Sequence, residues 1–248
     1  MKIHKNNITI FFGDAQHPID REFFNQAKTQ AELEQESSLH YSKQALNIES
    51  LFFTKQIHSA QGIIISQENY TSFLTMQPEG DFLITNKTHV GLGIYTADCL
   101  PIVIYDPEHH AVALAHAGWM GSVQEIAVKA MQALEKTHGS QKNKVHVYFG
   151  PAAGVCCYIV QPDFRENLTK FSFADQVIIK HDNQLYFDLL LFNKLQLVKY
   201  GVSLEAFNQS YTQCTIHNAS FCSYRRDNKN TARNVTLVAL KNQQIDTL

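Results

Sequence analysis

The feature of the sequence that most constrains the fold is a series of short β-rich runs between residues 51 and 117. The runs read LFFTKQ, GIIIS, DFLIT, VGLGIYTA, PIVIYD and AVALAH, and Gly, Pro, Asp and Asn residues separate them. Several runs are apolar at odd and even positions alike, so both faces of those strands must be covered by other layers. The series therefore predicts mixed β-sheets layered with helices.

The remaining segments predict helices and further strands around this series. Helices are expected over residues 21–46, 122–136, 163–171 and 187–200, and strands over residues 8–12, 145–151, 220–226 and 235–240. Ser122 and Glu125 have capping-box spacing, so Ser122 is the predicted N-cap of the second helix, and Gly201 is expected to end the last one. We expect an α+β fold: a single domain over residues 1–248 with α/β/β/α-type layers.

Composition excludes several classes of partner. The net charge is −2 at pH 7 and no long run of like charges occurs, so neither nucleic acid nor an anionic membrane is an expected partner. No apolar run approaches the roughly 20 residues that span a bilayer. The segment MKIHKNNITIFFGD lacks the pattern of a signal peptide, and the cysteine count of 5 is odd. These observations favour a cytoplasmic protein with reduced thiols.

Three residues that can bind a metal stand at the ends of predicted strands. His58 follows LFFTKQI, Cys99 follows VGLGIYTAD, and His116 follows AVALA. Residues at strand ends can converge on one rim of a sheet, and two imidazoles with one thiolate suit Zn²⁺ while leaving a fourth position open. The alternative is structural, because a lone His or Cys in such a context is commonly a buried packing residue.

Polar and aromatic neighbours of these residues can take part in chemistry. Asp98 is a cap, a turn residue or a catalytic carboxylate. In LAHAGWMGS, Gly118 and Gly121 allow close backbone approach before a helix N-terminus, which favours anionic or electron-rich groups. Trp119 can stack on a planar ring or simply cover the sheet edge.

Two further motifs admit more than one interpretation. Arg225 and Arg226, which precede Asp227, can bind a substrate anion through charge-assisted hydrogen bonds or form a buried ion pair. Cys156 and Cys157 are adjacent in GPAAGVCCYIV and cannot easily bridge each other, so we expect them to serve packing.

Taken together, five blocks resemble the signature of the laccase-domain family, also described as purine nucleoside phosphorylase/polyphenol oxidase-like (DUF152-type). The blocks occur in the family's order and read KQIHS, TADCLP, AHAGWMG, GPAAGVCCY and SYRRDNKNTAR. The resemblance implies mixed β-sheets packed between helices and a cytoplasmic zinc enzyme. It also implies that His58, Cys99 and His116 are the metal ligands, with copper a less favoured ion.

The activity implied by the resemblance is phosphorolysis of adenosine, inosine, guanosine and methylthioadenosine, together with hydrolytic deamination of adenosine. Purine nucleosides and phosphate are then the partners; the sequence leaves the oligomeric state open, with a homodimer one option. His58, Cys99, His116 and Asp98 are the expected catalytic residues, and Trp119, Arg225 and Arg226 the expected substrate-binding residues. In this interpretation an arginine helps to hold phosphate, and Asp98 assists proton transfer.

The sequence departs from the family's pattern at several positions. Met120 stands where the family usually has Arg, and Ile159 where it commonly has Glu. The closing block reads Thr231-Ala232-Arg233 instead of T-G-R, and the family's Gly-Gly-Val-Ser region is not recognisable in FFGDAQHPIDREFF. The departures leave metal binding better supported than the substrate range.

Three other functions compete with the zinc enzyme. Cys99 can be the nucleophile of a metal-free hydrolase, with His116 or His58 as its base. A multicopper oxidase of phenols would need many paired His ligands, whereas the chain has only the adjacent pair His109 and His110. The triad can also be a structural zinc site in a catalytically degenerate binding protein.

Overall fold

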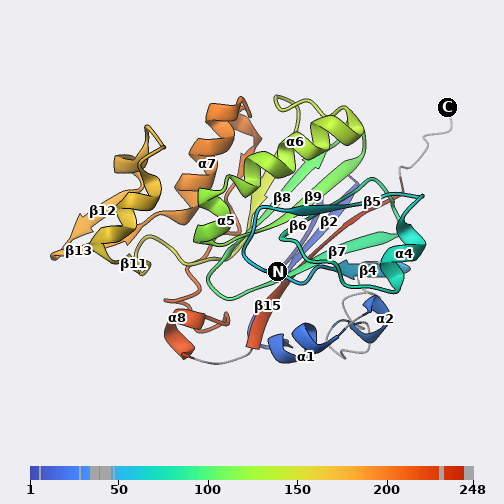
Figure 1. The fold of residues 1–248 in the computed structure, drawn as a ribbon, viewed down its shortest axis with the longest axis horizontal. Helices are drawn as coiled ribbons and strands as arrows, with labels where there is room; N and C mark the ends of the chain where they lie inside the picture. Colours follow the sequence, from blue (N-terminus) through green and yellow to red (C-terminus); the bar gives the residue numbers. More distant parts are fainter. Residues whose placement is uncertain are drawn as a thin grey trace.

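The computed structural model describes residues 1–5, 7–27, 29–33, 39, 46, 48–228 and 232–242. Two sheets lie face to face in it (Figure 1). The first has the strand order β1-β2-β15-β7-β4, and β3 also pairs with β15. Its strands are β1 (Lys2–Lys5), β2 (Ile8–Phe12), β3 (Ile19–Asp20), β4 (Ser50–Phe53), β7 (Val90–Thr96) and β15 (Ala232–Leu240).

The second sheet has the strand order β14-β10-β8-β9-β6-β5. Its strands are β5 (Gly62–Ile65), β6 (Phe82–Thr85), β8 (Leu100–Asp106), β9 (Ala111–Ala117), β10 (His146–Phe149) and β14 (Phe207–Asn208). All six β-rich runs between residues 51 and 117 thus form strands, as predicted. The strands expected over residues 8–12, 145–151 and 235–240 are confirmed as β2, β10 and β15.

Helices cover the outer face of each sheet (Figure 1). The inner faces share one apolar core, to which Leu92 and Val103 contribute from opposite sheets. Helices α6 (Ile126–His138) and α7 (Leu189–Tyr200) pack on the second sheet, and α1 (Arg21–Gln26) and α2 (Gln30–Leu33) cover the first. Every residue of β7, β8 and β9 is buried because cores lie on both faces of these strands. The predicted α+β fold with α/β/β/α-type layers is confirmed.

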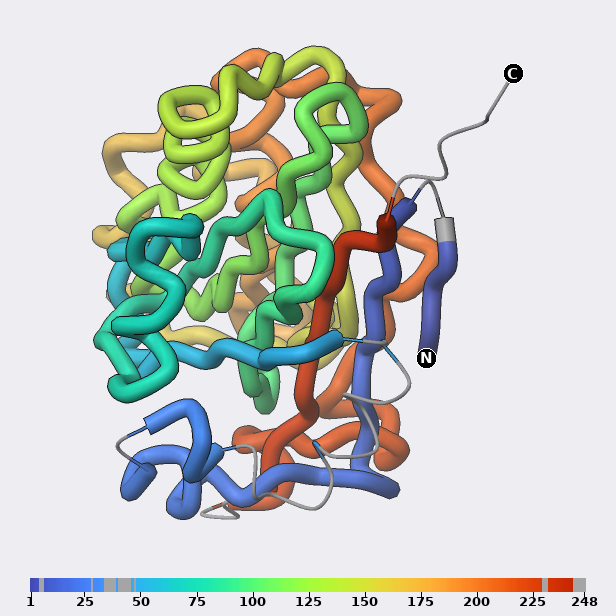
Figure 2. Tube along the Cα trace, turned by 90° about the vertical axis from the view of Figure 1, so that its right-hand side faces the viewer, coloured from blue at the N-terminus to red at the C-terminus, as the bar shows by residue number. Residues whose placement is uncertain are grey.

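The first and last long strands of the chain lie side by side in the first sheet. Strand β2 pairs antiparallel with β15, which joins segments from the two ends of the described chain (Figure 2). The short strand β3 pairs with the start of β15, where Asp20 lies opposite Ala232. This pairing places Arg21, the next residue along the chain, beside the start of β15.

The helix predicted over residues 122–136 is in fact two helices. Residues Trp119–Val123 form α5, and α6 begins at Ile126 after Glu125, which has a φ of 63°. The capping-box prediction is wrong because Ser122 is buried against α7. Its Oγ accepts a hydrogen bond from Asn193 Nδ2 at 2.9 Å, and its carbonyl accepts one from Gln196 Nε2 at 2.8 Å.

The helix expected over residues 21–46 is also interrupted. Helix α1 ends at Gln26, and Ala27 has an extended ψ of 135° before α2 begins at Gln30. Residues 28, 34–38 and 40–45 of that range lie outside the described residues. The prediction over residues 187–200 is close to the observed α7, which Asp188 caps and Gly201 ends with a φ of 108°.

A smaller three-stranded sheet extends from one end of the molecule, at the left of Figure 1. Its order is β11-β13-β12, and its strands are β11 (Ile159–Val160), β12 (Ile178–His181) and β13 (Gln184–Phe187). The helix predicted over residues 163–171 is the 3₁₀ segment η1 (Pro162–Leu168). Other short helical segments are α4 (Tyr70–Leu74), η2 (Ala174–Gln176) and η3 (Leu204–Ala206).

The strand predicted over residues 220–226 is wrong. Residues Tyr224–Asp227 form the one-turn helix α8 instead. Ser223 caps it, because its Oγ accepts a hydrogen bond from the Arg226 N–H at 3.1 Å. Within the described part of the chain, no helix has the length and apolarity to cross a membrane.

Candidate active site

Three side chains of types that can bind a metal come from distant parts of the sequence and meet at one rim of the sheets. His58 lies in the loop after β4, Cys99 in the turn between β7 and β8, and His116 in β9. One ligand atom of each lies within 4.8 Å of the others. Cys99 Sγ is 3.9 Å from His58 Nε2, and the two imidazole rings are edge to face with centroids 4.8 Å apart. The structure therefore brings together the residues that stood at three predicted strand ends.

A buried carboxylate that sequence reasoning did not single out supports this triad. Asp81 is fully buried just before β6, and its Oδ1 lies 2.9 Å from His116 Nδ1. A carboxylate oxygen accepts, so Nδ1–H donates and the ring turns Nε2 toward Cys99 and His58. The Asp81 carbonyl also accepts a hydrogen bond from the His116 N–H at 2.8 Å.

The same carboxylate shapes the loop that carries His58. Backbone N–H groups of Ile57, His58 and Ser59 donate to the Asp81 carboxylate at 3.3, 3.0 and 2.6 Å. The loop thus wraps around an anion, and His58 takes a φ of 58°, which is uncommon for a residue other than glycine. One buried group therefore orients two of the three ligands.

Glycine is required at two positions beside the triad, as the motif LAHAGWMGS predicted. A Cβ on Gly118 would lie 2.9 Å from Cys99 Sγ and 3.1 Å from His58 Cδ2. A Cβ on Gly121 would lie 2.8 Å from the Ser59 carbonyl oxygen. The following helix α5 is a single short turn, so close approach explains these glycines better than a helix dipole does.

The triad is electrostatically coupled. Burial acts to raise the pKa of Cys99, but His116 and His58 lower it to about 6. Burial acts to lower the pKa of His116, but the Cys99 thiolate and Asp81 raise it to about 9. Near neutral pH these shifts favour a thiolate facing an imidazolium in the metal-free cluster, which suits attack on an electrophile, whereas a bound cation displaces the imidazolium proton.

A cavity of about 380 Å³ opens over the triad. Such a volume is in the range of small-molecule sites. Its lining combines ligands, aromatic rings and cations: Arg21, Gln56, His58, Tyr95, Ala97, Asp98, Cys99, His116, Trp119, Met120, Tyr158, Tyr224, Arg225 and Arg233. The cations Arg21 and Arg233 were not singled out from the sequence, since they come from opposite ends of the chain and meet through the pairing of β3 with β15.

Asp98 lines the cavity, but both of its carboxylate oxygens already accept hydrogen bonds. Thr215 Oγ1 donates to Oδ1 and the Arg225 N–H donates to Oδ2, each at 2.7 Å. The Ala153 N–H donates to the Asp98 carbonyl at 2.9 Å. With a φ of 80°, Asp98 fixes the turn that presents Cys99 and joins it to two other loops.

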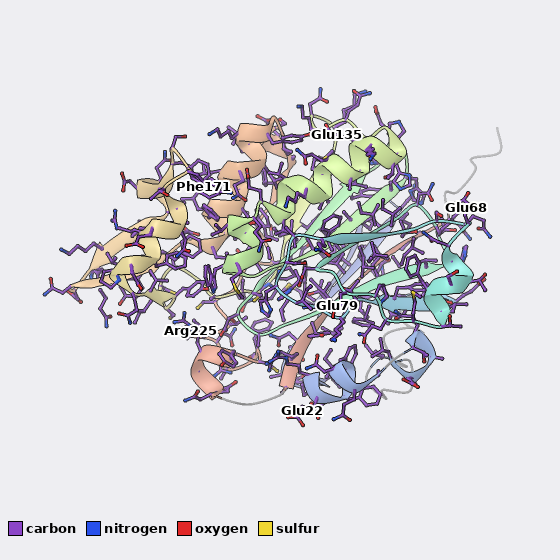
Figure 3. The ribbon with its side chains drawn as sticks, in the orientation of Figure 1. Glu22, Glu68, Glu79, Glu135, Phe171 and Arg225 are labelled. Carbon is purple, nitrogen blue, oxygen red and sulfur yellow. The ribbon has the colours of Figure 1, made fainter. Side chains whose placement is uncertain are left out.

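The two candidate arginines have different surroundings. Arg225 belongs to α8 (Figure 3) and is one of the residues that line the cavity. Its Nη1 donates to the Ile159 carbonyl at 2.9 Å, and its guanidinium lies over the Tyr158 ring at 4.9 Å. Arg226 is not among the cavity-lining residues. Its guanidinium donates to Asp227 and to carbonyls of the 215–221 loop, so it holds that loop.

Trp119 and Met120 lie at the cavity rim. Trp119 contacts Phe164 edge to face, with centroids 5.5 Å apart, and also lines the cavity. Its ring thus packs against the apolar core beside η1 and also borders the pocket, where it is placed for stacking, whereas its contacts among the described residues do not put it over a sheet edge. Met120 is 40% exposed and brings a thioether rather than a charge to the lining.

Comparisons with known proteins identify similar chains. Residues 24–241 match the family model described as multi-copper polyphenol oxidoreductase laccase. A protein named purine nucleoside phosphorylase from Clostridium acetobutylicum is 30% identical over 204 residues, which cover 80% of each chain. Adenosine deaminase RL5, from an unknown prokaryotic organism, is 27% identical over 77% of this chain and 75% of its own. The crystal structure of Bacillus licheniformis protein YfiH shares the fold with a TM-score of 0.82 and 23% identity, over 95% of this chain and 94% of that one.

Proposed function

The chain belongs to the multi-copper polyphenol oxidoreductase laccase family. We propose that it is a zinc-dependent purine nucleoside phosphorylase that also deaminates adenosine. The proposed substrates are adenosine, inosine, guanosine and methylthioadenosine, with phosphate as the second substrate. The observation that carries the proposal is the convergence of His58, Cys99 and His116 beneath a cavity lined by cations and aromatic rings. The names of the two curated relatives supply the reaction class.

The donor set fits zinc. Two imidazole nitrogens and one thiolate are the ligand types that Zn²⁺ takes, and a three-residue set leaves a coordination position for substrate. Asp81 supplies the carboxylate that commonly orients a zinc-bound histidine. Zinc supplies Lewis-acid chemistry when bound and lowers the pKa of water. The set provides too few ligands for a multicopper centre, which makes copper the less favoured ion.

Phosphate is assigned to the cationic part of the cavity. Arg233 is buried, and its pKa is lowered by burial and by the charge of the nearby Arg21. Two cations held close together attract an anion, which relieves their mutual repulsion. Arg225 adds a third positive group from α8, and guanidinium groups match phosphate oxygens with paired hydrogen bonds.

The purine is assigned to the aromatic part of the cavity. Trp119 and Tyr158 offer ring surfaces, and stacking of aromatic rings contributes roughly 0.5–1.5 kcal/mol beyond area burial. The cation over Tyr158 holds that ring in place. Since the carboxylate of Asp98 is occupied by Thr215 and Arg225, we assign this residue to positioning Cys99 rather than to proton transfer.

A nucleoside panel with metal analysis tests the proposal. Purified protein is assayed with each nucleoside in the presence and absence of phosphate, and its zinc content is measured. We expect about one zinc at the triad per chain, phosphate-dependent release of purine and ribose 1-phosphate, and inosine from adenosine. If the protein contains about one zinc per chain but forms none of these products, it is a zinc-binding protein without the proposed activity.

A second function is favoured by the electrostatics of the metal-free site. A thiolate facing an imidazolium is the arrangement that activates a cysteine nucleophile. In a metal-free cysteine hydrolase, Cys99 would attack and His116 would donate the proton to the leaving group. Retention of activity after zinc chelation, with loss after alkylation of Cys99, would support this function over the zinc enzyme.

A further inference from the structure

A second group of three metal-ligating side chains lies outside the proposed active site. The sulfurs of Cys156, Cys157 and Cys214 lie within 4.8 Å of one another, and all three are free thiols. The prediction that the adjacent pair serves packing is wrong for Cys156, whose side chain is exposed. Cys157 and Cys214 are half-buried. The cluster is thus assembled at the surface, where an ion can reach it.

The surroundings of Cys214 favour a thiolate. Backbone N–H groups of Gly154 and His217 donate to its Sγ at 3.3 and 3.4 Å. Burial acts to raise the pKa of Cys214, but such N–H donors hold it below its ordinary value. Gly154 is also needed for space, because a Cβ there would lie 3.0 Å from Cys214 Cβ and 3.4 Å from Cys156 Sγ.

The three sulfurs oppose one another's ionisation when no cation is present. A cation placed between the sulfurs reverses this effect, since a coordinating thiol is deprotonated on binding. The closeness of the three sulfurs, within 4.8 Å of one another, is the geometric basis for holding an ion between them.

We propose that Cys156, Cys157 and Cys214 form a binding site for a soft thiophilic cation, Cu(I), separate from the His58, Cys99 and His116 site. Among the described residues the group contains sulfur alone, with no imidazole or carboxylate. Thiolates select soft ions, and Cu(I) is satisfied by three sulfurs, whereas structural zinc sites take four protein ligands. The site does not depend on the proposed enzyme activity.

An ion at this position joins two loops that reach the active-site cavity. The 152–158 segment and the 213–217 segment already share hydrogen bonds, from the Ala152 N–H to the Gln213 carbonyl at 3.0 Å and from the Thr215 N–H to the Ala152 carbonyl at 2.9 Å. Cys157 is followed by Tyr158, which lines the cavity. Cys214 is followed by Thr215, which donates to Asp98. The ion thus clamps two segments that position cavity residues.

Titration of reduced protein with Cu(I) under anaerobic conditions tests the proposal. The Cys99→Ala variant removes the thiolate of the first site, and a colorimetric Cu(I) chelator reports the copper left unbound. We expect this variant to take up about one equivalent of Cu(I) at its three-thiolate site, with an X-ray absorption spectrum showing sulfur neighbours alone. Copper should also raise its thermal unfolding midpoint.

Three double variants locate the ion. In the Cys99→Ala background, Cys214→Ser and Cys156→Ser should each abolish copper uptake, whereas Cys222→Ser should not, because Cys222 lies outside the cluster. Because Cys156 is exposed, Cys156→Ser should fold. It therefore tests the site even if Cys214→Ser does not fold. The proposal is overturned by no copper uptake in Cys99→Ala, or by undiminished uptake in folded Cys99→Ala/Cys156→Ser.

Discussion

Two clusters in this molecule bring three potential ligand atoms within the same 4.8 Å, yet they differ in donor types and in surroundings. The His58, Cys99 and His116 cluster mixes nitrogen with sulfur and faces a lined cavity. The Cys156, Cys157 and Cys214 cluster has sulfur alone and lies at the surface. Proximity makes both groups candidates for metal binding. The donor types and the space in front of them distinguish a site for chemistry from a site that holds an ion.

The support behind the ligands differs as well. Asp81, with no exposed surface, accepts from His116 Nδ1 and from three consecutive backbone N–H groups around His58. Cys214 is supported by two backbone N–H groups at longer distances. A buried charge with many partners imposes one geometry, whereas backbone donors to sulfur permit adjustment to the ion. The first cluster is thus preorganised, whereas the second is adaptable.

The largest effect expected from this comparison follows removal of one ligand of the first cluster. His116→Ala should eliminate stoichiometric zinc at the triad and reduce phosphorolysis to the background, because two remaining ligands cannot hold the ion tightly. Zinc analysis measures the metal content, and a nucleoside assay measures the rate of phosphorolysis. His109→Ala is the matched control, since His109 also pairs with an aspartate, Asp106, but lies outside the cavity lining. Full activity in His116→Ala would assign the chemistry to other groups.

The next largest effect contrasts the thiols of the two clusters in metal-free protein. The pKa of Cys99 is lowered to about 6 and that of Cys156 is raised to about 12. At pH 7 the thiolate fractions differ by roughly 10⁵, and the weaker nucleophilicity of the less basic thiolate offsets about 10² to 10³ of this. Iodoacetamide should therefore modify Cys99 about 100-fold faster than Cys156.

Peptide mass spectrometry across a pH series measures both rates. The rate at Cys99 should rise with a midpoint near pH 6, because a lowered pKa keeps the thiol ionised above that pH. Added zinc should protect Cys99. Faster modification of the exposed Cys156 at pH 7 would contradict the coupling between Cys99 and His116.

A smaller effect is expected when the support of the first cluster is weakened and its ligands are kept. Asp81→Asn retains the size of the side chain but removes the charge that orients His116 and the His58 loop. We expect zinc affinity and kcat/KM to fall by about 10–100-fold, as is usual for the partners behind metal ligands. Asp106→Asn is the matched control, because Asp106 likewise accepts from a histidine and from two backbone N–H groups. If zinc affinity and kcat/KM fall equally in Asp81→Asn and Asp106→Asn, Asp81 has only a general structural role.

The strands could be predicted because they depend on local patterns, whereas the convergence of the triad is indicated mainly by the resemblance to the family. Each β-rich run is bounded by turn residues, and His58, Cys99 and His116 stand where runs end. The family resemblance carried by five blocks is confirmed by the match over residues 24–241. Local patterns fail where burial decides instead. Ser122 has a capping-box spacing, but the side chains of Asn193 and Gln196 draw it into the interface with α7.

The missed residues of the site depend on pairing between distant segments. Asp81 precedes a strand like any turn aspartate, and only the adjacency of β6 and β9 places it against His116. Arg21 and Arg233 belong to the two ends of the chain and meet because β3 pairs with β15. Cys214 follows the Cys156 and Cys157 pair by more than fifty residues with no recognisable spacing. Pairing between distant segments, which periodicity does not encode, fixes each of these contacts.

The smallest expected effect is a gain of function that sharpens the role of the cationic cavity. Met120 lines the cavity at the position where the family usually has Arg, and it is 40% exposed, so a guanidinium fits there without burial. Met120→Arg should lower the KM for phosphate about fivefold with kcat little changed, since one partly exposed charge-assisted hydrogen bond contributes about 1 kcal/mol. Met76→Arg is the matched control, because Met76 is 45% exposed and lies outside the cavity lining. Initial rates at varied phosphate measure the effect. An unchanged KM would show that a cation at residue 120 does not reach phosphate held at Arg21, Arg225 and Arg233.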